Sequence, residues 1–174
     1  MVDLNKLAAE IHEAAVKKGF WSVEDAENKH LAKMISELGE VVQADRAGIM
    51  YEIERDGAKP EGVVAELADF VMMVLDYMAQ YGITLPEEDI STWVEPECDD
   101  ALVWLRKVNA YGLVLATNAT LVCLANDEST AGCLEMLYAI ERWTLLRGYD
   151  LWKCIREKME YNENNRAYLH GRLY

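Results

Sequence analysis

With 174 residues, 52% of them hydrophobic, the chain is long enough to bury the core of one domain and too apolar to stay disordered. Its 31 acidic residues outnumber the 17 basic ones, and a net charge of −14 argues against binding to nucleic acid or to an anionic membrane surface. A polyanionic ligand can bind such a chain only if cations lie between the ligand and the carboxylates.

The cysteines show no C-x-x-C pair and no spacing typical of a zinc site, which favours reduced thiols in a core: Cys98, Cys123, Cys133 and Cys154. Charged residues near the start, among them Asp3 and Lys6, leave no signal-peptide pattern. The most hydrophobic stretch, residues 63–79, carries three acidic residues and is too polar to span a bilayer. We therefore expect a soluble, cytoplasmic protein.

Helical periodicity dominates the chain, and its three prolines all fall between periodic segments. Ser22 is the expected N-cap of the second helix, and Gly19 the expected end of the first. We expect a loop over residues 51–60, an acidic connection over 86–96, and helices over residues 3–18, 23–48, 61–81, 99–125, 129–147 and 150–164. The predicted fold is an all-α antiparallel bundle of five to six helices, in a single domain over residues 1–174.

The third predicted helix is apolar around most of its circumference, which is typical of a helix buried among others. Its remaining stripe carries Glu66, Asp69 and Asp76, and buried ionised carboxylates need partners. The second predicted helix offers Glu37 and Glu40, one turn apart and away from its apolar face. Two such pairs on facing helices predict an acidic metal pocket between the two central helices. Because no cysteine or paired histidine joins them, Mg²⁺ or Mn²⁺ is favoured over zinc.

A solvated helix face is the alternative interpretation of these carboxylates. It suits Glu37 and Glu40 taken alone, because E-x-x-E is common on surface helices, and it suits Glu66 and Asp69 less well. Asp76 is either a supporting residue of the site or an exposed end of the stripe. A di-iron site is excluded because the pair Glu27 and His30 has no second Glu-x-x-His, so we expect His30 at the surface or its boundary.

Four motifs, in order along the chain, carry a resemblance. They are KKGFW at 17–21, SELGE at 36–40, ELAD at 66–69 and the tail KMEYNENNRAYLHGRLY at 158–174. This set resembles the MazG-like all-α NTP pyrophosphohydrolases, whose signature is Glu-Glu-x-x-Glu on one helix and Glu-x-x-Asp on the next. The resemblance covers most of the chain except about residues 83–132, which we expect to form a helical insertion or extension.

The resemblance implies that Glu37, Glu40, Glu66 and Asp69 bind Mg²⁺. It also implies hydrolysis of a (d)NTP to the (d)NMP and pyrophosphate by a metal-activated water, with Glu40 or Glu37 as the base. Ser36 stands where the first Glu of the family motif is usual, which leaves the number of metals and the identity of the base open. The gap from Asn162 to Arg166 is one residue longer than usual, so Asn165 or Arg166 can occupy the expected place.

Lys158, Asn162 and Arg166 are the expected phosphate contacts, with a basic helix end stabilising the helix dipole as the alternative. Trp21 is expected either to stack on the nucleobase or to pack as a staple before the second helix. We also expect a homodimer or homotetramer formed through the apolar helices near residues 101–125. A different class of function remains open, in which a non-catalytic helical interaction module uses the acidic face for protein contact.

Overall fold

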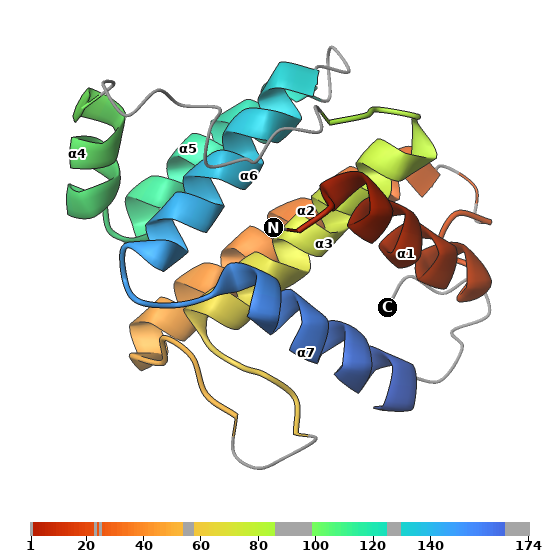
Figure 1. The fold of residues 1–174 in the computed structure, drawn as a ribbon, viewed down its shortest axis with the longest axis horizontal. Coiled ribbons are helices and arrows are strands. Elements are labelled where there is room, and N and C mark those ends of the chain that lie inside the picture. The colour runs from red at the N-terminus through yellow and green to blue at the C-terminus, as the bar shows by residue number, and fades with distance from the viewer. Residues whose placement is uncertain are drawn as a thin grey trace.

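The computed structural model of the protein describes residues 2–22, 24, 26–53, 58–85, 99–124 and 130–165. Within these residues the chain forms seven α-helices (Figure 1): α1 Leu4–Lys17, α2 Ala26–Ala47, α3 Val63–Gln80, α4 Asp99–Lys107, α5 Ala110–Leu124, α6 Thr130–Leu145 and α7 Leu151–Asn165. The only extended pairing in this part of the chain is an isolated antiparallel bridge between Glu52 and Glu61. The predicted all-α class is confirmed.

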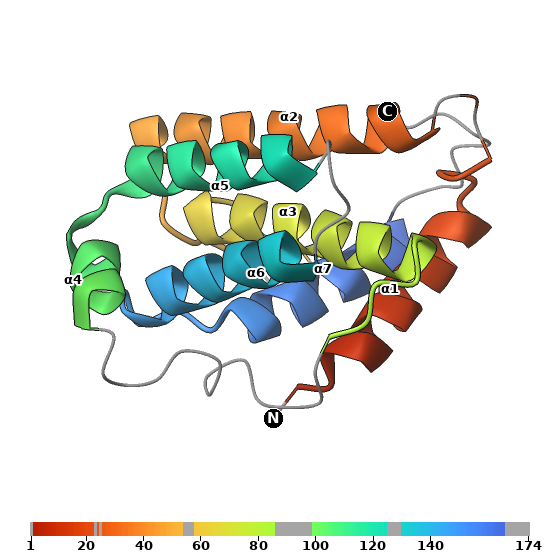
Figure 2. The ribbon, with the colours of Figure 1, turned by 90° about the horizontal axis from the view of Figure 1, so that it is seen from above.

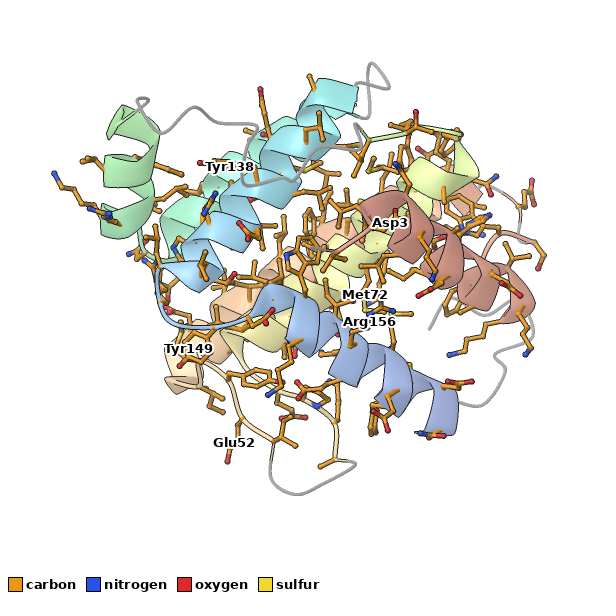
Figure 3. The ribbon with its side chains drawn as sticks, viewed as in Figure 1. Asp3, Glu52, Met72, Tyr138, Tyr149 and Arg156 are labelled. Carbon is orange, nitrogen blue, oxygen red and sulfur yellow. The ribbon has the colours of Figure 1, made fainter. Side chains whose placement is uncertain are left out.

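Helix α3 is the central element of the fold and contacts α1, α2, α6 and α7. Because its side chains are apolar on nearly every side, it buries 13 of its 18 residues. Phe70, Tyr77 and Met78 are each at most 1% exposed. Side chains fill the space between the surrounding helices (Figure 3). The acidic stripe of α3 is therefore carried into the interior, as its composition predicts.

The helices lie in layers around α3. Helices α2 and α5 pack side by side, α3 and α6 follow, and α1 and α7 lie beyond them (Figure 2). Helix α2 runs antiparallel to α3, so the second half of α2 lies along the first half of α3 (Figure 2). This arrangement brings the two predicted acid pairs, one on each helix, to the same region.

The connection between α2 and α3 holds the start of α3 against the end of α2. The amides of Val63 and Val64 donate to the carbonyls of Ile49 and Met50, at 3.0 and 2.9 Å. These bonds satisfy two of the N–H groups that a helix start leaves without an intrahelical partner. Gly62 makes the turn with φ of +102°, a conformation that favours glycine. The predicted loop over 51–60 is thus tied at both ends, with the Glu52–Glu61 bridge across its base.

The predicted helix over 99–125 is wrong in one respect, because the chain breaks it into α4 and α5. The side chain of Asn109 accepts a hydrogen bond from the amide of Gly112 at 3.0 Å and so caps α5. The carbonyl of Val108 accepts from Trp143 Nε1 at 3.0 Å and from Arg147 Nη2 at 2.6 Å. These partners replace the intrahelical bonds lost at the break. The described helices therefore number seven, not five to six.

The starts of the first two helices show one cap that was not predicted and one predicted cap that is absent. Asp3 caps α1 through a hydrogen bond from the amide of Lys6 at 2.9 Å. Ser22 does not cap α2, because its hydroxyl donates back to the carbonyl of Gly19 at 2.8 Å and α2 begins only at Ala26. The predicted start of the second helix is therefore three residues too early.

Two cysteines, Cys133 and Cys154, are free and buried, and burial raises the pKa of their thiols to about 11 and 12. Cys98 and the side chain of Cys123 lie outside the described residues. Among the described helices, none has the length and apolar character that crossing a membrane requires. The single domain over 1–174 and the insertion over 83–132 stay predictions, although α5 packs against both α2 and α6.

Two alanine substitutions test the α2–α3 connection. A Cβ on Gly62 would lie 2.9 Å from main-chain atoms of residues 49 and 50, so Gly62→Ala should lower the free energy of unfolding by about 2 kcal/mol. Gly39 is exposed and lies in the middle of α2, where an added Cβ meets nothing within 4 Å. Gly39→Ala should therefore raise the free energy of unfolding by about 0.5–1 kcal/mol. Urea unfolding followed by circular dichroism measures both. Equal effects of the two substitutions would contradict this account.

Candidate metal centre

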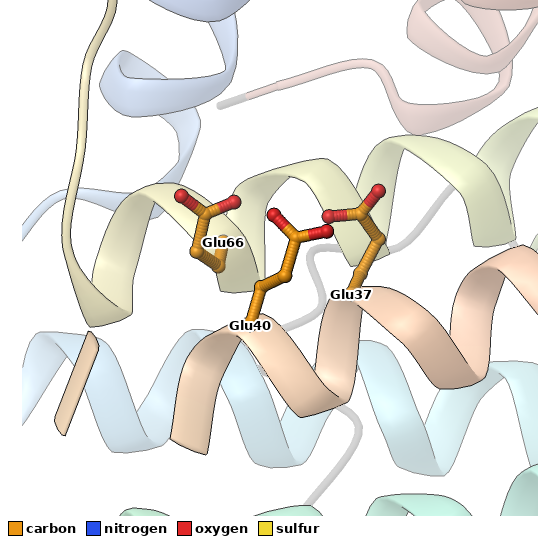
Figure 4. Close-up of side chains that lie close together, drawn as sticks. All are labelled: Glu37, Glu40 and Glu66. Atoms are coloured by element: carbon orange, nitrogen blue, oxygen red, sulfur yellow. The ribbon is translucent and has the colours of Figure 1, made fainter. Parts of the chain in front are cut away.

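Three carboxylates from α2 and α3 converge at the interface of these helices. One oxygen each of Glu37, Glu40 and Glu66 lies within 4.8 Å of the others (Figure 4). Glu37 and Glu66 are buried, at 5% and 7% exposure, and Glu40 is half-buried. The antiparallel packing and the tether at Gly62 bring the first turn of α3 beside the last turns of α2. An all-oxygen donor set of this kind is the one that Mg²⁺ and Mn²⁺ prefer.

Asp69, the fourth predicted ligand, adjoins this group but is bound differently. It lies one turn after Glu66 on α3, and its Oδ2 is 2.5 Å from Nζ of Lys158. Its charge raises the pKa of both Glu37 and Glu66, although desolvation is the larger cause in each case. Asp69 thus belongs to the same electrostatic cluster and faces a lysine.

Two lysines neutralise part of the cluster in the structure. Lys158 of α7 is 1% exposed and, besides Asp69, lies 3.7 Å from Oε2 of Glu66. Lys33 of α2 is hydrogen-bonded to Glu37 and lies 3.8 Å from Oε1 of Glu40. Cations of the chain itself therefore supply part of the charge that the predicted metal pocket needs. Sequence reasoning missed Lys33, although its spacing of four residues from Glu37 is the signal of a helical ion pair.

The position of Lys158 follows from the way α7 packs. Leu151, Cys154 and Ile155 form the inner face of α7 and are at most 2% exposed. Lys158 continues this face by one further turn, and α7 lies against α3. A buried ammonium needs a counter-charge, which the carboxylate of Asp69 supplies. In this structure Lys158 contacts carboxylates, and its contact with a phosphate stays a prediction.

Glu66 is the least satisfied member of the cluster. Its side chain is 9% exposed, and among the described residues its Oε2 is buried without a hydrogen-bond partner. Desolvation raises the pKa of Glu66 to about 7, and the charge of Lys158 opposes this shift only in part. A buried oxygen without a hydrogen-bond partner is costly, and a cation bound to it would remove that cost. The residues present therefore fit a divalent cation.

A second polar cluster surrounds Asp76, two turns further along the stripe of α3. Its Oδ1 accepts from Trp21 Nε1 at 2.9 Å and lies 2.7 Å from His12 Nδ1. His30 stacks on Trp21 with ring centres 4.6 Å apart, and its Nε2 lies 2.9 Å from the carbonyl of Met73. Asp76 and His30 are 4% and 3% exposed, so Asp76 is not an exposed end of the stripe and the predicted surface position of His30 is wrong. The cluster fixes the orientation of the Trp21 ring.

The remaining predicted contacts lie at the end of α7. Asn162 is half-buried one turn after Lys158, and its carbonyl accepts a hydrogen bond from Lys18 Nζ at 3.1 Å. Arg166 and the side chain of Asn165 lie outside the described residues. The choice between them as a phosphate contact stays a prediction.

No family model matches this chain. The curated proteins and the solved structures likewise hold no match to it. The MazG-like resemblance therefore rests on the four sequence motifs, and the function must be argued from the residues of the cluster itself.

Glu66→Gln tests the electrostatics of the metal-free cluster. Because folding raises the pKa of Glu66, the protein is most stable when this carboxyl group is protonated. The contribution of Glu66 to the free energy of unfolding is lost as pH rises from about 4.5 to about 7. In chelated buffer, Glu66→Gln should match the parent at pH 5 and exceed its free energy of unfolding at pH 8, by at most about 3 kcal/mol. Asp69→Asn is the contrast, because it deprives buried Lys158 of its closest partner and should destabilise at both pH values. A Glu66→Gln difference that does not grow with pH would contradict the assignment.

Proposed function

We propose that the protein is a Mg²⁺-dependent nucleoside triphosphate pyrophosphohydrolase that converts a (d)NTP to the (d)NMP and pyrophosphate. The observation that supports it is the convergence of carboxylate oxygens of Glu37, Glu40 and Glu66, together with a buried Glu66 oxygen that lacks a hydrogen-bond partner. The motif resemblance adds the reaction class. A cytoplasmic location belongs to the same proposal.

In this proposal Glu37, Glu40 and Glu66 hold the divalent ion, Mg²⁺ or Mn²⁺, with Asp69 beside them as the fourth ligand. When bound, the ion would offset the charge of the triphosphate and lower the pKa of a coordinated water. Glu40 is half-buried and is the more accessible carboxylate of its pair, so it is the better placed to accept a proton from that water. Glu37 is already hydrogen-bonded to Lys33.

Groups for the rest of the substrate lie along the same stripe of α3 and on α7. Lys158 contacts Asp69 and lies 3.7 Å from Glu66, and a bound phosphate would compete with Asp69 for it. Asn162 and Arg166 follow it in the chain. Trp21 is held by Asp76, which is seven residues and thus about 10 Å along α3 from Asp69. Trp21 is half-buried, so part of its ring stays available to a nucleobase.

The alternative function, a helical module that binds a protein partner through its acidic face, is less well supported. An electrostatic contact surface needs solvent-exposed charges. Glu37, Glu66 and Lys158 are all at most 7% exposed, so they suit a small ligand inside the bundle better than a macromolecular surface.

Pyrophosphate release from a panel of NTPs and dNTPs in Mg²⁺ or Mn²⁺ tests the proposal directly. Glu40→Gln and Glu66→Gln should each lower kcat/KM by about 10²-fold or more, because each removes a metal ligand or the base. Glu160→Gln, an exposed acid on α7, serves as the matched control and should retain full activity. Helical circular dichroism should be unchanged in all three variants. Absence of pyrophosphate release by the parent protein with every substrate would refute the assignment.

We further propose that two copies associate through the outer face of α5. Tyr111, Leu115 and Val122 lie on one side of this helix and are 40%, 71% and 52% exposed. No charged residue occurs from 108 to 125, although 28% of the chain is charged. Copies that each carry a charge of −14 repel one another, and an uncharged apolar face is where they can approach with least cost. A homodimer, or a homotetramer built from it, follows.

Leu115→Glu should convert the assembly to monomers, because it places a charge at the centre of this face. Leu145→Glu on α6 is the matched control, since Leu145 is also an exposed leucine, at 51%, but lies on another helix. Light scattering gives the mass of each variant. A parent protein with the mass of one chain would remove the proposed assembly, and a Leu115→Glu variant that stays dimeric would place the interface elsewhere.

A further inference from the structure

Lys33 has an unusual position within the carboxylate cluster. Its ammonium is hydrogen-bonded to Glu37 and lies 3.8 Å from Glu40, so it bridges the two carboxylates that α2 contributes. Its side chain is 24% exposed, which leaves the ammonium partly shielded from water. An ammonium group therefore sits on the α2 side of the cluster, held between two carboxylates.

Lys158 plays the corresponding part on the α3 side, against Asp69 and Glu66. Metal ligands must be deprotonated, and four ionised carboxylates with two ammonium groups then leave a net charge of −2. One divalent ion balances this charge, whereas two would leave the substrate-free cluster at +2. Ser36, next to Glu37, is exposed and adds no carboxylate to the group. The oxygen that lacks a hydrogen-bond partner is Oε2 of Glu66, which lies 3.7 Å from Nζ of Lys158.

We infer that Lys33 is a built-in cation of this centre, which occupies the place of a second divalent ion between Glu37 and Glu40. The substrate-free protein then binds one divalent ion per chain, next to the buried Glu66 oxygen. This inference rests on the proposed metal centre and specifies its stoichiometry. It also assigns Lys33 a role that differs from that of an ordinary surface ion pair between residues four apart on a helix, which contributes little.

Calorimetric titration of Mn²⁺ into the metal-free protein tests the inference without reference to activity. The parent protein should bind one Mn²⁺ per chain. Lys33→Met keeps the length of the side chain and removes its charge, so it should bind two. Lys33→Gln is a second variant with the same expected result, in case the first does not fold. Electron paramagnetic resonance of Mn²⁺ would report the second ion independently.

Lys29→Met is the matched control, because it removes the same charge one turn earlier on α2. Lys29 is exposed and donates to the carbonyl of Glu24, away from the cluster. It should bind one Mn²⁺, with an affinity within about twofold of the parent, because a screened surface charge acts weakly at this distance. The inference would be overturned if the parent protein binds two Mn²⁺ per chain, or if both Lys33 variants bind only one, whatever its affinity. Either result would leave the proposed metal centre intact. No Mn²⁺ uptake by the parent would overturn the metal centre itself.

Discussion

The burial of charge on α3 is the constraint on which the rest of the structure depends. A helix that is apolar on most of its surface must be enclosed, and enclosing it carries Glu66, Asp69 and Asp76 out of water. Each of these groups then needs a partner. Asp69 finds Lys158, and Asp76 finds His12 and Trp21, which come from other segments of the chain. The packing of α1, α2 and α7 around α3 supplies those partners.

Glu66 differs from Asp69 and Asp76 because no partner fully neutralises its charge. Lys158 lies 3.7 Å away and is already closer to Asp69, so the charge of Glu66 is compensated only in part. Burial with only partial compensation is also the reason that the pKa of this carboxyl group is raised. A structural role alone would have been served better by an apolar residue at this position. A group kept buried at such a cost is typical of a functional site.

The two ends of the stripe have different chemistry. The carboxylate cluster near the start of α3 offers oxygen ligands and lysines, which suit a cation and phosphate groups. The cluster around Asp76 offers aromatic rings held in place by hydrogen bonds, which suit a flat apolar group. A nucleoside triphosphate combines both kinds of group in one molecule, and the two clusters lie along one helix, around Glu66 and Asp76 of α3.

Local pattern determined most of the helices and the burial of α3, because periodicity is a property of short segments. The approach of Glu37 and Glu40 to Glu66 was expected from the sequence, but it depends on how α2 packs on α3. Local pattern did not determine the break at Val108, where Trp143 and Arg147 replace intrahelical bonds, since these residues lie about 35–39 positions away in the chain. Nor did it place Lys158 against Asp69, across 89 positions. Such contacts depend on how helices dock, and only the tertiary structure decides which buried charge meets which partner.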